Sequence, residues 1–346
     1  MTVQDIAASA EDVSISPKNP NIMWELKSYL HQNYYKRKLD EVLFGLSRFT
    51  PDYHPDKCDH NAADWLFVLN TMNFALWNPK NAKQWTVNEL TGYQALCAAI
   101  KRAIDNNIPI WDPNYYTCIK QCDLEIIFKS DDGETSIPLI RERQEILYKV
   151  GNVLLEKYGG SFKQFIQLCE NDPFKLLVKI VNEFESYQDR VTYTNTTTTK
   201  EIDLCTKART LVSDIWFCFK GHELGIKYNP TMMKSTIFTD HRISQVFLHF
   251  KVLEYSEKLM TKLKNNEPLK HGSPEEIEIR SCSLHTVELL KEAISKDCDE
   301  FMKKKKIEMK IDYQILIDNF LWDYRHVHDQ LLMETQPFPN IKCVYY

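Results

Sequence analysis

The stretch NELTGYQALCAAIKRAIDN, residues 88–106, carries the clearest structural signal in the chain. Its apolar side chains recur every three or four residues, which is the spacing of one face of an α-helix. They are Leu90, Tyr93, Leu96, Cys97, Ile100 and Ile104. We therefore expect an amphipathic helix that packs this face against a core.

Helical spacing continues on both sides of this stretch. Residues 138–158 start at Pro138, which suits a first helical turn, and stop before Gly159-Gly160, which suits a helix end. Residues 61–77 are apolar and aromatic almost all round, which predicts a buried helix. Further helices are expected over residues 22–37, 161–169, 173–184, 202–219, 241–264, 275–301 and 312–333.

Strand signals are few. Residues 125–129, followed by Asp132-Gly133, could be one arm of a hairpin. The run RVTYTNTTTT, residues 190–199, is rich in β-branched side chains and could be a short strand or an exposed polar loop. No internal repeat or low-complexity linker divides the chain. We predict a mainly α, compact multi-helix fold with at most a few short strands. It would be a single domain over residues 1–346, whose helices could form two lobes around a cleft.

Composition argues against several classes of protein. Only 9 of the 346 residues are Gly, which disfavours folds that need many close backbone approaches. No GxGxxG or P-loop sequence supports a nucleotide-cofactor fold. The net charge of −5 argues against a general nucleic-acid binder. The polar, acidic N-terminus and the lack of a long apolar run predict neither a signal peptide nor a membrane span, so we expect a cytoplasmic protein.

The ten cysteines are scattered along the chain, which in a cytosolic protein indicates reduced thiols rather than disulfides. The stretch from His54 to His60, with Cys58 between them, is the richest in metal-ligating side chains. It lacks a recognisable zinc spacing, as does the pair Cys118 and Cys122, so we expect no metal site.

The segment Phe238-Thr239-Asp240-His241-Arg242 precedes a predicted amphipathic helix and is the first candidate site. Thr239 or Asp240 could simply cap that helix by accepting hydrogen bonds from backbone N–H groups, and the local pattern alone favours this interpretation. A carboxylate held ionised at a helix N-terminus would also suit a catalyst that stabilises positive charge.

Three other segments contain candidate polar side chains. Asp318 and Asp323 flank an apolar patch in a helical run, where they would lie at the core boundary, because positions five apart do not share a helix face. Asn73 lies in the apolar stretch 61–77 and needs a hydrogen-bond partner in the core or a ligand. Lys207 and Arg209 could bind a phosphate or form a solvated face, and their spacing keeps them off a common helix face.

These segments together resemble the queuosine salvage protein family. The ordered matches include DWLFVLNTMNFALW (residues 64–77), GYQALCAAI (92–100), PLIRER (138–143), LEKYGGSF (155–162), EIRSCSL (278–284) and CVYY (343–346). The resemblance implies a largely helical fold similar in shape to DNA glycosylases. It also implies hydrolysis of the N-glycosidic bond of queuosine 5′-monophosphate, which releases queuine for tRNA modification.

The resemblance also implies site residues. Phe238 and Asp240 match the family's F-x-D motif, in which the Asp is the catalytic nucleophile, and Phe238 could stack on the deazaguanine. Asp318 and Asp323 match acids that bind the base. Asn319 stands where the family has a base-pocket Tyr. The remaining substrate-binding candidates are His54 and Asn73 in the pocket and, for the 5′-phosphate, Lys207, Arg209 and Arg242. No metal or organic cofactor is implied, and we expect a monomer that acts on a small molecule without contacting nucleic acid or membrane.

Besides Asn319, other positions depart from the family's pattern. Thr206 and His241 replace an expected Lys and Tyr, and Asn70 replaces an expected Asp. Retention of Asp240 favours an enzyme, whereas these changes leave open a queuine-binding protein without turnover. A DNA-repair glycosylase would need a basic groove, which the net negative charge opposes.

Overall fold

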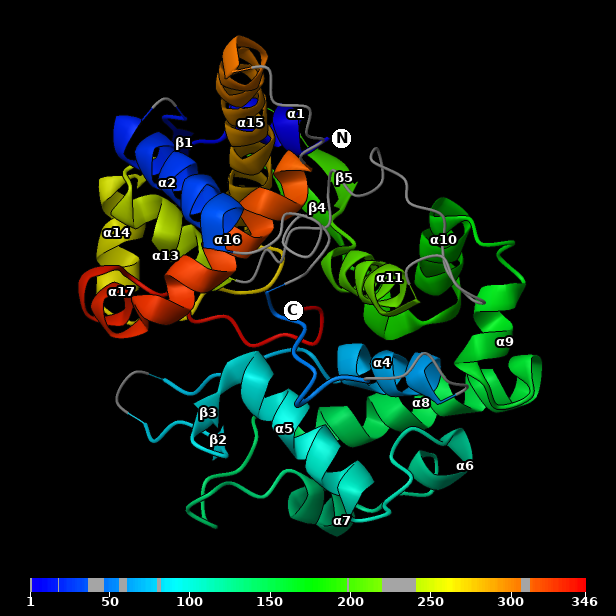
Figure 1. Ribbon diagram of the computed structural model, residues 1–346. Helices are drawn as coiled ribbons and strands as arrows, with labels where there is room; N and C mark the ends of the chain where they lie inside the picture. Colours follow the sequence, from blue (N-terminus) through cyan, green and yellow to red (C-terminus); the bar gives the residue numbers. More distant parts are fainter. Residues whose placement is uncertain are drawn as a thin grey trace. The chain divides into compact units, whose positions relative to one another are not determined.

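The computed structural model describes residues 2–17, 19–36, 47–55, 61–79, 82–197, 199–219, 241–305 and 312–346 (Figure 1). The chain folds into two compact units, each made of separate stretches. Unit 1 comprises Met1–Arg48, Arg190–Leu204 and Ile237–Lys342, and unit 2 comprises Phe49–Asp189, Cys205–Thr236 and Cys343–Tyr346. Helices dominate both units, which confirms the mainly α class. The single domain and the likeness to DNA glycosylases stay predictions.

Unit 1 is organised around the long helix α15, against which α1, α13 and α16 pack (Figure 1). Its helices are α1 (Val3–Ser9), α2 (Pro20–Lys36), α13 (His241–His249), α14 (Glu257–Lys264), α15 (Pro274–Lys305), α16 (Tyr313–Val327) and α17 (Asp329–Thr335). Strand β1 (Val13–Ile15) pairs antiparallel with β6 (Leu253–Tyr255), and β4 (Arg190–Thr194) pairs antiparallel with β5 (Thr199–Asp203).

Glu278 on α15 joins the two small sheets of unit 1 to that helix. Its buried carboxylate accepts hydrogen bonds from the backbone N–H groups of Glu11, Asp12 and Val13, at 3.1, 2.7 and 3.2 Å. It also accepts one from the Tyr193 hydroxyl at 2.8 Å. One acid therefore satisfies the start of β1 and a side chain of β4, as a buried carboxylate requires.

Unit 2 contains the remaining helices and one short hairpin. The helices are α4 (Ala62–Thr71), α5 (Gly92–Asp105), α6 (Pro113–Tyr116), α7 (Gln121–Ile127), α8 (Ile140–Tyr158), α9 (Phe162–Gln167), α10 (Pro173–Glu183) and α11 (Thr206–Phe219), with the 3-10 turn η1 (Glu185–Tyr187). Strands β2 (Thr86–Val87) and β3 (Leu90–Thr91) pair antiparallel. Helix α4 packs against α11, and α8 packs against α6 and α7.

Two local features fix the packing of α8 and α9. A Cβ at Gly151 would collide with the side chains of Tyr116 and Thr117, so glycine permits the close approach of α8 and α6. The carboxylate of Asp64 on α4 accepts a hydrogen bond from the Phe162 N–H at 2.5 Å and thereby caps α9 from another helix. Burial raises the pKa of Asp64 to about 7.

Most predicted helices form, although several of their ends differ. The helix predicted over residues 138–158 forms as α8, which begins at Ile140 rather than Pro138 and ends as expected before Gly159. Gly159 is in the left-handed conformation, with φ 59°. The run 61–77 was predicted too long, because α4 stops at Thr71. The run 241–264 is wrong as one helix. Lys251 adopts φ 52°, and the chain then forms β6 before α14.

The strand predictions had mixed outcomes. Residues 190–199 include β4 and the start of β5, so the strand interpretation is confirmed over the polar loop. The predicted strand over residues 125–129 is wrong, because this segment ends helix α7. Asp123 accepts a hydrogen bond from the Lys120 N–H at 3.1 Å, which supports the start of that helix.

Candidate active site

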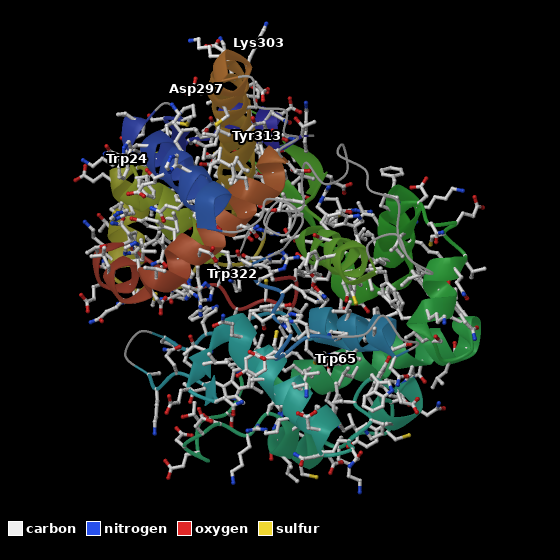
Figure 2. The ribbon with its side chains drawn as sticks, viewed as in Figure 1. Trp24, Trp65, Asp297, Lys303, Tyr313 and Trp322 are labelled. Atoms are coloured by element: carbon white, nitrogen blue, oxygen red, sulfur yellow. The ribbon has the colours of Figure 1, made fainter. Side chains whose placement is uncertain are left out.

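Helix α16 in unit 1 carries three of the predicted substrate-binding residues, Asp318, Asn319 and Asp323. Asp318 and Asn319 are buried, and Asp323 is half-buried. Figure 2 labels Trp322 on this helix. Side chains from α2 and from residues 47–48, distant in sequence but in the same unit, contact these residues. Gln314 of α16 and Lys291 of α15 also act on Asp318.

Asp323 and Asn319 share the partner Ser47. The hydroxyl groups of Tyr29 and Ser47 both donate to Asp323 Oδ2, at 2.5 and 3.2 Å. The Ser47 backbone N–H donates to Asn319 Oδ1 at 2.8 Å. Both donors use Oδ2, and no described residue donates to Oδ1 of Asp323. Asp323 is thus held in one orientation with an acceptor still available to a ligand.

Asp318 has different surroundings. Its side chain is 9% exposed, and its Oδ1 has no hydrogen-bond partner in the described part of the chain. Burial raises the pKa of Asp318 to about 8, and the nearby Arg48 guanidinium opposes this shift without cancelling it. A carboxyl group with this pKa is largely protonated at neutral pH and can donate a hydrogen bond or, beside a cation, ionise.

Arg242, a predicted phosphate ligand, is the second residue of α13 and is half-buried in unit 1. Burial lowers the pKa of His326 on α16, and the charges of Arg325 and Arg242 lower it further. Arg242 therefore lies close enough to the end of α16 to act electrostatically on it. Phe238 and Asp240 fall outside the described residues, as does the side chain of His241.

His54 is buried in unit 2 and has defined partners. Its Nε2 lies 2.9 Å from the Tyr93 hydroxyl and 3.7 Å from Cys97 Sγ. Its Nδ1 lies 3.1 Å from the Thr50 N–H, and its ring stacks on Phe49 with centroids 4.2 Å apart. A ligand role for His54 stays a prediction, because these contacts alone explain a buried histidine.

Lys207 on α11 is 3% exposed, and its ammonium group interacts with backbone carbonyls and aromatic rings. Nζ donates to Val344 O at 2.9 Å and to Thr71 O at 3.4 Å. It lies 4.8 Å from the Tyr187 ring centroid and 5.2 Å from that of Phe74. Burial lowers the pKa of Lys207 to about 7. Lys207 thus joins the end of α4 to residues 343–346, a role that the sequence did not indicate.

Arg143 on α8 is a second buried cation, with 0% exposure. Its guanidinium donates to Pro138 O at 2.9 Å, to Phe74 O at 2.6 Å and to Met72 O, and its Cζ lies 4.2 Å from the Phe74 ring centroid. Burial lowers the pKa of Arg143 to about 9, so the group is still charged at neutral pH. No carboxylate among the described residues ion-pairs with it.

Arg143 and Lys207 together hold residues 72–75, which we call the 72–75 loop. Arg143 binds two of its carbonyls, Lys207 binds the carbonyl of Thr71 just before it, and the Ala75 N–H donates to Tyr346 O at 3.0 Å. The side chain of Asn73 is half-buried in this loop and has no hydrogen-bond partner among the described residues. The loop therefore fixes the backbone on either side of Asn73 and leaves its amide available to a ligand.

The buried ammonium predicts a pH-dependent stability for unit 2. The unfolded chain keeps Lys207 protonated up to about pH 10.5, whereas the folded chain releases the proton near pH 7. Between these pH values the unfolded state binds more protons, so Lys207 makes the free energy of unfolding rise with pH. The variant Lys207→Met lacks this contribution and loses a donor to two carbonyls. We expect its deficit relative to the parent protein to grow by about 1 kcal/mol or more from pH 6 to pH 9.

Urea unfolding of both proteins at the two pH values measures this difference. The exposed Lys264 on α14 provides the control, because Lys264→Met should change stability by less than about 0.5 kcal/mol at either pH. A deficit of the Lys207 variant that is the same at pH 6 and pH 9 would contradict the assignment.

Asp318, Asn319, Asp323 and Arg242 thus belong to unit 1, whereas His54, Asn73, Lys207 and Arg209 belong to unit 2. Arg209 is half-buried on α11, and its phosphate role stays a prediction. Sequence reasoning missed Tyr29, Ser47 and Arg143. The sequence did contain a signal for the burial of Arg143, because this residue lies on the same helical stripe as the apolar residues Leu147, Val150 and Leu154.

Within the described residues, no three His, Cys, Asp or Glu side chains are arranged to hold a metal ion. Cys58 and His60 of the candidate zinc stretch lie outside those residues. Every described cysteine is a free thiol. None of the helices in the described ranges combines the length and the apolar character needed to cross a bilayer.

Comparison with known proteins identifies the family of this chain. The family model described as "Queuosine salvage protein" matches residues 53–346. A protein of Bos taurus named queuosine 5′-phosphate N-glycosylase/hydrolase is 34% identical over 299 residues, covering 85% of this chain and 84% of its own. Proteins of the same name from Nematostella vectensis and Sphaerobacter thermophilus are 32% and 33% identical, covering 92% and 82% of this chain and 90% and 81% of their own. The chain belongs to the queuosine salvage protein family.

Proposed function

We propose that this chain hydrolyses the N-glycosidic bond of queuosine 5′-monophosphate and releases queuine for tRNA queuosine salvage. The observation that carries the proposal is the state of the two acids on α16, Asp318 and Asp323. Asp318 Oδ1 is buried without a hydrogen-bond partner among the described residues, in a helix that is otherwise packed in the core. Asp323 is half-buried, and both of its described donors use Oδ2. Buried carboxyl oxygens without partners are costly unless a ligand uses them.

The chemistry of the released base fits these acids. Queuine has a cationic aminomethyl-cyclopentenediol arm and a base edge with hydrogen-bond donors. Asp323, oriented by Tyr29 and Ser47, can pair with the ammonium group. Asp318 can donate to or accept from the base edge, because its carboxyl group exchanges a proton near neutral pH. Phe238 would stack on the base plane.

Bond cleavage is assigned to Asp240. Breaking the bond gives the anomeric carbon oxocarbenium character, which a fixed carboxylate stabilises or attacks. The departing nitrogen base needs protonation or hydrogen bonding, which the acids on α16 can supply. Arg242 is the candidate in unit 1 for holding the 5′-phosphate. This reaction needs no metal or organic cofactor. We further propose that the protein acts as a cytoplasmic monomer and contacts no nucleic acid directly.

The proposal is tested by incubating the protein with queuosine 5′-monophosphate and measuring free queuine by chromatography. We expect queuine release, and we expect Asp318→Asn to raise KM by about tenfold or more, because the amide keeps the shape but cannot ionise. The control is Asp297→Asn on α15, whose carboxylate makes an exposed ion pair with Lys27 at 2.7 Å and should not affect the reaction.

If neither the nucleotide nor the nucleoside yields queuine, the proposed reaction is wrong. Tight binding of queuine without turnover would then indicate the alternative, a queuine-binding protein. Equal KM values for the parent protein and the Asp318 variant would remove Asp318 from the base site while leaving the reaction intact.

A further inference from the structure

Unit 2 contains a groove that the glycosidase site does not use. It has a volume of about 560 Å³ and lies between α8, the segment that joins α10 to η1, and residues 344–345. We call it the acidic groove. Its volume is within the range of small-molecule sites, which run from about 300 to 1,000 Å³. All of its lining residues belong to unit 2.

The charge of the acidic groove is strongly one-sided. Four carboxylates line it, from Glu142, Glu145, Glu183 and Glu185, against the single cation Lys149. Lys149 pairs with Glu185 at 2.8 Å, and Glu183 pairs with a lysine outside the groove. Glu142 and Glu145, both on α8, make no ion pair or hydrogen bond with a described residue. Lys149 and Arg143 act on these two carboxylates only through longer-range electrostatics. The groove therefore presents two carboxylates without a direct partner and an excess of negative charge, which attracts a cation and repels phosphate or carboxylate ligands.

The floor and rim of the acidic groove are apolar and aromatic. Ile146, Val150 and Phe184 are buried beneath it. Tyr148 lines its edge with 58% of its surface exposed, and Tyr345 lines it from the C-terminal residues. An exposed aromatic ring next to unpaired carboxylates suits a cation attached to an apolar body, because the ring face and the carboxylates both attract the charge.

A buried hydroxyl group provides an independent indication of a ligand. Ser186 in η1 lines the acidic groove, is 7% exposed, and its Oγ has no hydrogen-bond partner among the described residues. Buried side-chain hydroxyls nearly always have a partner, and an unsatisfied one costs about 1–3 kcal/mol. A ligand with an N–H or O–H group on its apolar body would satisfy it.

We propose that the acidic groove binds a small organic cation, an ammonium group on an aromatic or aliphatic body, with Glu142 and Glu145 as its counter-charges. A bare divalent ion fits less well, because no metal-binding group of His, Cys, Asp or Glu occurs among the described residues and much of the lining is apolar. The proposal does not depend on the glycosidase activity, since no residue of the groove belongs to the site on α16 or to the 72–75 loop.

The experiment uses tyramine as the probe and tyrosol, which has a hydroxyl group in place of the amine, as the matched neutral compound. Titration of the full-length protein at low salt is followed by calorimetry or ligand-observed NMR. We expect tyramine to bind at least about tenfold more tightly than tyrosol. The double variant Glu142→Gln, Glu145→Gln should lose this preference. Glu156→Gln, which changes an exposed acid of α8 outside the groove, should keep it.

Two further variants separate the groove from the acids on α16. Asp318→Asn should bind tyramine as the parent protein does, whereas Ser186→Ala should weaken binding by about two- to tenfold. Melting temperatures of all variants establish that they are folded. Equal affinities for tyramine and tyrosol, undiminished binding by the double variant, loss of binding in Asp318→Asn, or no binding up to about 10 mM would each overturn the proposal.

Discussion

Asp240→Asn is expected to lower the rate of queuine release by about a thousandfold or more, because the variant cannot supply negative charge to the oxocarbenium-like transition state. Asparagine is a suitable replacement here, because it removes the negative charge of residue 240 but keeps its ability to cap a helix. Helix α13 begins at the next residue, His241, and asparagine caps helices about as well as aspartate does. If residue 240 serves only as a cap, the variant should keep its activity.

Single-turnover assays with queuosine 5′-monophosphate measure the rate of queuine release and so test this prediction. The melting temperature and the dissociation constant for queuine are the controls. We expect the last two quantities to change little, since the base is assigned to the acids of α16. Activity within about tenfold of the parent protein would exclude Asp240 as the nucleophile. Parallel loss of stability would instead show that residue 240 has a structural role.

Arg143→Met is expected to destabilise unit 2 by about 3 kcal/mol or more. The substitution removes the donor to three buried carbonyls, those of Pro138, Met72 and Phe74, and each such group left unsatisfied costs about 1–3 kcal/mol. A lysine ammonium group lacks the forked geometry with which the guanidinium reaches three acceptors. Arg143→Lys should therefore keep only part of the stability that Arg143→Met loses.

Urea unfolding of the two variants measures the effect, and Arg141→Met is the control. Arg141 lies on the same helix but is exposed, so its substitution should cost less than about 0.5 kcal/mol. A loss below about 1 kcal/mol for Arg143→Met would mean that the 72–75 loop does not depend on the guanidinium. In that case Arg143 would be a tolerated buried charge rather than an organising one.

The parts of the fold that the sequence predicted are those governed by neighbours in sequence. Most of the stripe in residues 88–106 lies in α5, although Leu90 is in β3, and α8 ends as expected before Gly159. Helix ends that depend on distant groups were not predictable. The stretch 61–77 reads as one buried helix, yet it stops at Thr71, and the carbonyls that follow bind Arg143 rather than continuing a helical ladder.

In the candidate site, too, residues could be predicted from the local sequence, whereas their distant partners could not. Asp318 and Asp323 could be found on their own helix, with the family resemblance giving them a role. Their partners could not, because Tyr29 is 294 residues from Asp323 and Ser47 is 276 residues away. Lys207 was expected on a solvated face or at a phosphate. Its burial depends on a carbonyl 137 residues away, at Val344, which no local pattern encodes.

Each unit is built from stretches that alternate along the chain, so partners in the fold are synthesised at different times. Strand β1 near the start pairs with β6, so the growing chain must carry β1 unpaired until the ribosome has added more than two hundred residues. In unit 2, α11 is synthesised well before Val344, so the site of Lys207 lacks one wall until 137 further residues have been added. Neither unit can therefore fold fully as it leaves the ribosome. Long-range pairings of this kind slow folding and leave apolar surface exposed on the nascent chain, where chaperones act.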